Sequence, residues 1–249
     1  MQGLLEEVRA SATPVRGAIV PHAGLEYSGA CAAEVFKRVQ LAPTVVILAP
    51  NHTGRVGAPG GASAWTTGAF ETPLGRHGIA EDFLHELCRQ CDLLAHDPVA
   101  HEREHAIEVE LPFLSLLSPE SLIAPIVLAW DDWDRCRELG DALANAVRGW
   151  SEPVSLLASS DMTHFETAAS AEQKDRVALA HIAQLDGAGL LEACERLPIT
   201  MCGRAPAATV LHAAKLLGAT AGELVDYRHS GWVTGDDHSV VAYAGVIIP

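Results

Sequence analysis

The sequence predicts an α/β fold, because short apolar runs rich in β-branched residues alternate with amphipathic segments along most of the chain. The amphipathic segments repeat apolar residues at intervals of three and four, which is helical spacing. At 249 residues the chain is long enough for one large core, and no repeat or Gly/Ser-rich linker divides it. We therefore expect residues 1–249 to form a single domain.

The β-branched runs are the expected strands, and they lie at 17–20, 44–48, 122–128, 154–157 and 239–248. The segments with helical periodicity are the expected helices, at 28–39, 81–93, 104–117, 133–148, 171–184, 187–196 and 207–217. Residues 54–68 carry five glycines and one proline, so a surface loop is expected there.

The charge of the chain excludes one class of partner. Lys and Arg number 17 against 32 Asp and Glu, for a net charge of −15, so no nucleic acid is expected to bind. The longest apolar stretches fall well short of the roughly 20 residues that cross a membrane. The first residues lack the basic and apolar pattern of a secretory signal, so we expect a cytoplasmic protein without a membrane partner.

Three histidines follow the ends of predicted strands. His22, His52 and His164 stand in the segments after the strands at 17–20, 44–48 and 154–157. Ligands of α/β sheets bind at the carboxyl ends of the strands, where the loops converge. The sequence therefore predicts that these three imidazoles meet at one edge of the sheet.

A cluster of imidazoles is typical of a transition-metal site, and two imidazoles with one anionic ligand leave coordination positions open for a substrate. Cys202 is the best candidate for the anionic ligand. It stands just before the predicted helix at 207–217, and both a helix N-terminus and the guanidinium of Arg204 would stabilise a thiolate. The alternative is a buried thiol that serves only packing.

Asp161 precedes His164 by three residues in the loop after a predicted strand. At this spacing the carboxylate could orient the imidazole as a general acid or base. A capping role for Asp161 is the alternative. The sequence contains no phosphate-binding glycine motif and no G-x-S-x-G, so nucleotide binding and serine hydrolysis have no support.

The segment from His101 to His105 matches the H-E-x-x-H motif of zinc proteases. That motif requires a helix, yet Pro98 lies just upstream and the apolar periodicity begins only at Ile107. A zinc protease is therefore the weaker alternative. In the favoured interpretation, His105 lies at a helix start and turns toward a pocket.

Six blocks of the sequence, in order, resemble the Memo family. They are AIVPHAG at 18–24, LAPNH at 48–52, EHAIEVELPFL at 104–114, ASSDMTH at 158–164, CGRAP at 202–206 and DHSVVAYAG at 237–245. Bacterial and archaeal members are similar to protein B of the AmmeMemoRadiSam system, which implies an Amme-domain protein and a radical-SAM protein as partners. The family is similar in fold to the LigB-type class III extradiol dioxygenases, which implies a mixed, mostly parallel sheet flanked by helices.

The resemblance implies that His22, His52 and Cys202 are the metal ligands. It places His164 where the dioxygenases have their acid/base histidine, and it places Asp161 in the same pocket with His105 nearby. The dioxygenases have a carboxylate where this sequence has Cys202. Because a thiolate is softer, zinc and copper become competitive with iron, which remains the first expectation.

We therefore expect a metal-dependent oxidoreductase, similar to an extradiol dioxygenase, that acts on a small substrate such as a phenol. In this reading His164 and Asp161 are catalytic, and His105 and Arg204 line the substrate pocket. An alternative from another class is a module that binds a peptide or protein within the AmmeMemoRadiSam system and performs no chemistry. The zinc protease remains the third possibility.

Overall fold

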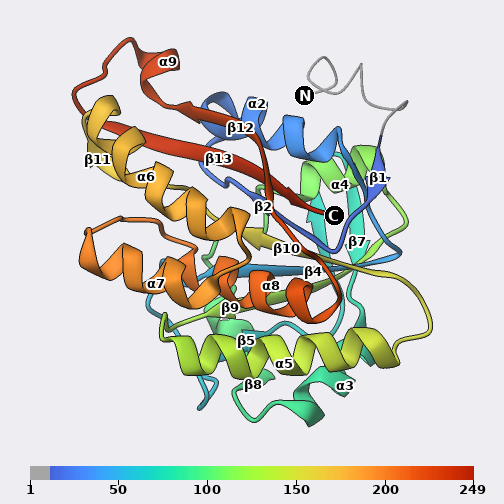
Figure 1. The fold of residues 1–249 in the computed structure, drawn as a ribbon. Helices are drawn as coiled ribbons and strands as arrows, with labels where there is room; N and C mark the ends of the chain where they lie inside the picture. The colour runs from blue at the N-terminus through green and yellow to red at the C-terminus, as the bar shows by residue number, and fades with distance from the viewer. Residues whose placement is uncertain (1–11) are drawn as a thin grey trace.

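The computed structural model describes residues 12–249, which form a central sheet with helices on both faces (Figure 1). The strands of the sheet are β2 (Gly17–Val20), β4 (Thr44–Pro50), β5 (Ala62–Ala64), β8 (Leu94–His96), β9 (Leu122–Leu128), β10 (Val154–Ser159), β11 (His164–Glu166), β12 (Glu223–His229) and β13 (Val240–Ile248). Their spatial order is β11-β13-β2-β10-β4-β9-β5-β8, and β12 pairs with β13. The expected α/β fold with a mixed sheet is confirmed.

The parallel pairs are concentrated in the centre of the sheet, where β2, β10, β4 and β9 lie side by side. The pairs that flank this centre, β13 with β2 and β5 with β9, are antiparallel. Every residue of β2, β4 and β10 is buried. Strands covered on both faces need continuous apolar runs, which explains why apolar and polar residues do not alternate in these sequences.

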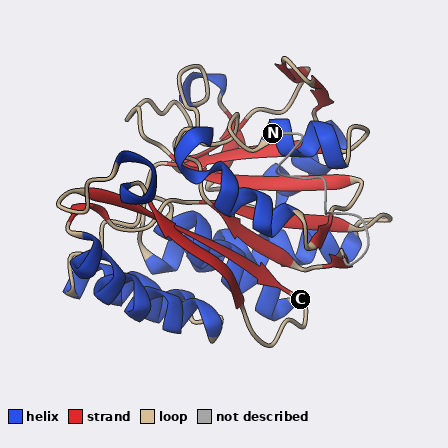
Figure 2. Ribbon diagram, turned by 90° about the horizontal axis from the view of Figure 1, so that it is seen from above, coloured by secondary structure: helices blue, strands red, loops and turns tan. Residues whose placement is uncertain are grey.

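Helices cover both faces of the sheet, as the view from above also shows (Figure 2). Helices α2 (Leu25–Phe36) and α4 (Leu111–Leu117) lie on one face. The other face carries α5 (Trp133–Gly149), α6 (Ala168–Ala183), α7 (Gly187–Arg196) and α8 (Arg204–Leu216), while α3 (Glu81–Gln90) packs beside α5. Among the described helices, none has the length and apolar character needed to cross a membrane.

The expected helix at 104–117 begins only at Leu111, so the prediction for residues 104–110 was wrong. These residues form turns instead. The cause lies in Glu104, whose carboxylate accepts hydrogen bonds from the backbone amides of His52 and Ala106. A side chain that binds nearby backbone competes with helix formation. Pro112 then occupies the first turn of α4, where a missing amide hydrogen costs little.

The prediction of a loop throughout 54–68 was also wrong, because β5 lies within it and pairs with both β8 and β9. Its sequence of Ala, Ser and Ala has little β-propensity, so the neighbouring strands impose the extended conformation. Strand β12 was not expected at all. It carries charged residues and lies at the margin of the sheet, where polar side chains reach solvent.

The carboxyl ends of β2, β4 and β10 meet at the same edge of the sheet, because these strands are parallel neighbours in register. The loop before α8 reaches the same edge, where the amide of Gly203 donates a 2.9 Å hydrogen bond to Ser160 Oγ. A Cβ on Gly203 would lie 2.3 Å from the Ser159 carbonyl oxygen. Only glycine permits this close approach.

We predict that Gly203→Ala lowers the free energy of unfolding by about 1–3 kcal/mol, because the added methyl group must push the loop off β10. Gly149→Ala is the matched control, since a Cβ there meets no heavy atom within 4 Å among the described residues. Urea denaturation of both variants measures the difference. Equal stabilities would contradict the close approach.

Candidate metal centre

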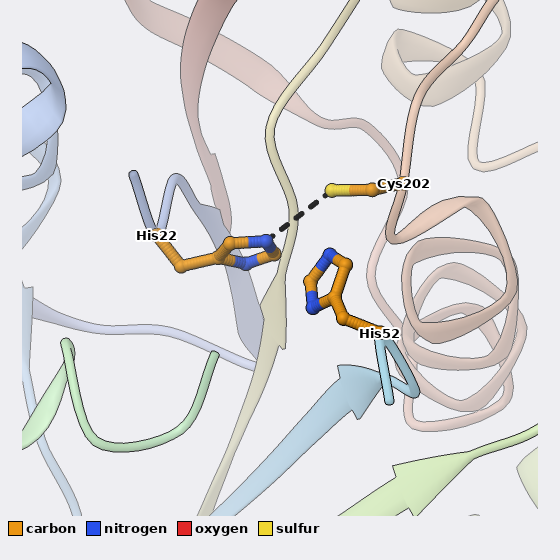
Figure 3. Close-up of side chains that lie close together, drawn as sticks. All are labelled: His22, His52 and Cys202. Atoms are coloured by element: carbon orange, nitrogen blue, oxygen red, sulfur yellow. Dashed lines mark hydrogen bonds between the residues drawn. The ribbon is translucent and has the colours of Figure 1, made fainter. Parts of the chain in front are cut away.

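Three side chains from separate parts of the chain converge at this edge of the sheet (Figure 3). His22 follows β2, His52 follows β4, and Cys202 stands two residues before α8. Their ligand atoms all lie within 4.8 Å of one another, and the Cys202 sulfur is 3.3 Å from His22 Nε2. The structure thus brings together the three residues that the sequence analysis selected as metal ligands.

Each imidazole is held through its Nδ1 atom by a group behind it. His52 Nδ1 lies 2.8 Å from Glu104 Oε1, and His22 Nδ1 lies 2.8 Å from Ser159 Oγ. The Nε2 atom of His22 therefore points toward Cys202. Partners of this kind fix the ring orientation and tautomer of histidines that bind metals.

Glu104 accepts three hydrogen bonds within the site. Burial of its side chain opposes ionisation, but hydrogen bonds from the His52 ring, the His52 amide and the Ala106 amide outweigh that effect and lower the pKa of Glu104 to about 2. The same hydrogen bond raises the pKa of His52. An ionised carboxylate only accepts, so His52 carries its hydrogen on Nδ1 and its lone pair on Nε2.

The other two candidate ligands are neutral in the absence of a cation. Burial lowers the pKa of His22 well below its usual range, and the nearby His52 and His105 lower it further. Burial also raises the pKa of the Cys202 thiol, and the Asp161 carboxylate adds to this effect. The expected stabilisation of a thiolate by Arg204 is absent, because Arg204 Nε bonds Asp131 Oδ2 at 2.7 Å.

His164 lies near this cluster but is held by Thr200, not by Asp161. Its Nδ1 is 3.0 Å from the Thr200 carbonyl oxygen, and its amide donates to Thr200 Oγ1. Asp161 Oδ1 instead accepts the amide hydrogens of His22 and Ala23. Asp161 therefore positions the backbone of a candidate ligand, and the expectation that it orients the His164 ring was wrong.

His105 joins the cluster, whereas His101 does not. The ring centroid of His105 lies 4.9 Å from that of His52 and 5.6 Å from that of His22. His101 is buried elsewhere, with its Nε2 2.9 Å from the Ser63 carbonyl oxygen, and residues 101–105 are not helical. The helical geometry that a zinc protease motif needs is thus missing from this segment.

Two clefts border Cys202. One, of about 340 Å³, is lined by residues that include Asn51, Trp130 and Pro206. The other, of about 530 Å³, is lined by residues that include Thr200 and Arg204. Asp131 lines both clefts. Cys202 therefore lines both clefts, whereas His22, His52 and His164 line neither.

Sequence reasoning missed three residues that organise this site, namely Glu104, Ser159 and Thr200. Glu104 could have been suspected, because a carboxylate directly before a candidate pocket histidine is a common partner for imidazole. Ser159 and Thr200 left no comparable signal. A serine at a strand end and a threonine in a loop occur in most proteins, and only the fold brings these two to the histidines.

Comparison with known proteins identifies relatives along nearly the whole chain. A family model described as Memo-like protein matches residues 2–247. A MEMO1 family protein of Methanopyrus kandleri is 39% identical over 249 residues, covering 98% of this chain and 87% of the relative. MEMO1 family proteins of Methanocaldococcus jannaschii and Aquifex aeolicus are 38% and 39% identical, covering 93% and 92% of this chain and 83% and 84% of those relatives.

We predict that Glu104→Gln weakens zinc binding about 10–100-fold, because the neutral amide holds the His52 ring less firmly and makes it a poorer donor. Glu102→Gln is the matched control, since Glu102 is exposed two residues away. Competition with a chromophoric chelator measures both affinities. Unchanged affinity in Glu104→Gln would show that Glu104 has no influence on the centre.

The raised pKa of Cys202 predicts that zinc affinity increases with pH. The thiol is protonated at neutral pH in the metal-free protein, so binding must expel that proton, and affinity should rise about tenfold per pH unit. The slope should become steeper below the raised pKa of His52, where a second proton is lost. Chelator competition over a pH series tests this, and a pH-independent affinity would exclude the thiol as a ligand.

Proposed function

Because this chain belongs to the Memo family, we propose that it is a metal-binding oxidoreductase whose centre consists of His22, His52 and Cys202. The observation that carries the proposal is the convergence of two imidazoles and one sulfur within 4.8 Å. Iron is the first candidate, and zinc and copper are the alternatives. The substrate is a small molecule, with phenols as the first class to test.

The donor set suits such an ion. Because Glu104 binds the Nδ1 side of the His52 ring, the lone pair on His52 Nε2 is free to bind a metal. The Nε2 atom of His22 faces the sulfur of Cys202. Two imidazoles and a thiolate fit iron, zinc or copper better than magnesium or calcium, which prefer oxygen ligands. Three protein ligands also leave positions for a substrate.

A bound metal would act as a Lewis acid toward a substrate hydroxyl and as a path for electrons. The protein groups around it supply proton transfer and orientation. His164 can donate from Nδ1 to the Thr200 carbonyl, which leaves its Nε2 able to take the proton of the hydroxyl. Asp161 holds the His22 backbone in place while this occurs.

The clefts beside Cys202 suit a small substrate. Their volumes of about 340 and 530 Å³ lie in the range of small-molecule sites. Trp130 lines the first cleft, and the cationic Arg204 lines the second. A phenol in the first cleft could pack against the indole, and a substrate carboxylate in the second cleft could compete with Asp131 for Arg204.

We predict that His164→Gln reduces kcat about 100-fold or more while metal content stays unchanged, because the variant removes the base and no ligand. The assay is oxygen consumption by the iron-loaded protein with a panel of phenols. His85→Gln, an exposed histidine on α3, is the control. Turnover that survives in His164→Gln would remove His164 from the mechanism.

Two results together would contradict the enzymatic proposal. The wild type would turn over none of the phenols in the panel, and the metal-free His22→Ala variant would still bind a partner protein. These results would favour the alternative of a binding module.

A further inference from the structure

A buried carboxyl group stands behind His22 and has no role in the mechanism above. Glu110, the residue before α4, is 1% exposed. Its Oε1 lies 3.1 Å from Ser159 Oγ, the hydroxyl that holds His22. Its Oε2 is buried and has no hydrogen-bond partner among residues 12–249.

The hydroxyl of Ser159 has three neighbours but only one hydrogen to give. These are the Ala106 carbonyl oxygen at 2.6 Å, His22 Nδ1 at 2.8 Å and Glu110 Oε1 at 3.1 Å. The Ala106 oxygen is an acceptor only and is the nearest, so it receives the hydrogen. The two remaining contacts of Ser159 Oγ then require donors.

These donors must be His22 Nδ1–H and the carboxyl hydrogen of Glu110. An ionised Glu110 would face the lone pairs of Ser159 at 3.1 Å and would leave a second charged oxygen buried without a partner. Leaving a buried charge unpaired is far more costly than burying a neutral acid. Burial accordingly raises the pKa of Glu110 well above its usual range.

We propose that Glu110 is a positioning residue that remains an un-ionised carboxylic acid. By donating to Ser159 Oγ, it keeps the hydroxyl hydrogen directed at the Ala106 carbonyl oxygen, which leaves His22 only the tautomer with hydrogen on Nδ1. The lone pair of His22 is thereby directed from Nε2 toward Cys202. The two imidazoles would then differ in their support. The Nδ1 atom of His52 is bonded to the ionised carboxylate of Glu104. The Nδ1 atom of His22 is bonded to the neutral hydroxyl of Ser159, which in turn contacts the neutral acid Glu110.

This proposal rests on the proposed function only in treating His22 as a metal ligand. The protonation of Glu110 can be tested without any metal. Infrared difference spectra between the full-length wild type and Glu110→Gln at neutral pH should show loss of the carbonyl band of an un-ionised acid. Glu108→Gln, an exposed residue two positions away, should show loss of carboxylate bands only. Loss of carboxylate bands alone in Glu110→Gln would overturn the proposal.

The second readout is zinc affinity in two variants. The amide of Glu110→Gln can still donate to Ser159, so its affinity should equal that of the wild type. Glu110→Leu cannot donate, so its affinity should fall about tenfold. Equal weakening in both variants would overturn the positioning role. If Glu110→Leu does not fold, the infrared spectra and the zinc affinity of Glu110→Gln still test the proposal. A wild type that binds no metal would defeat the proposed function but not the infrared result.

Discussion

The ionised carboxylate of Glu104 is the interaction on which the candidate site depends. It binds the His52 ring and two backbone amides at once, so it ties the loop after β4 to the segment before α4. The same bonds keep residues 104–110 out of a helix and bring the His105 ring beside His52. One buried charge therefore determines both the local fold and the orientation of a candidate ligand.

The charges of the site explain why a cation suits it. Glu104 is ionised, the Asp161 carboxyl group lies beside Cys202, and Cys202 would add a further negative charge as a thiolate, whereas His22 remains neutral. Arg204 cannot balance them, because it pairs with Asp131. A divalent ion between the two imidazoles and the sulfur would offset much of this negative charge. In its proposed un-ionised state, Glu110 adds no further negative charge to the same buried region.

Much of this arrangement could be predicted from the sequence, because parallel strands bring the residues after them to one edge. His22 and His52 were found this way, and Cys202 was found from its place before a helix. The residues that hydrogen-bond to these candidate ligands and orient them could not be predicted. Glu104 and Glu110 belong to a stretch whose periodicity resembles a helix, and hydrogen bonds to Glu104 from His52, which is distant in the chain, and from Ala106 prevent that helix. Likewise β5 is extended because its neighbours impose it.

Metal analysis tests the central claim most directly. Wild-type protein purified without oxygen should contain close to one transition-metal ion per chain, and iron is the expected element. Cys202→Ser should lose it, while Cys194→Ser, which changes a buried cysteine on α7, should keep it. Equal metal content in the wild type and Cys202→Ser, or none in the wild type after reconstitution, would contradict the assignment of this centre.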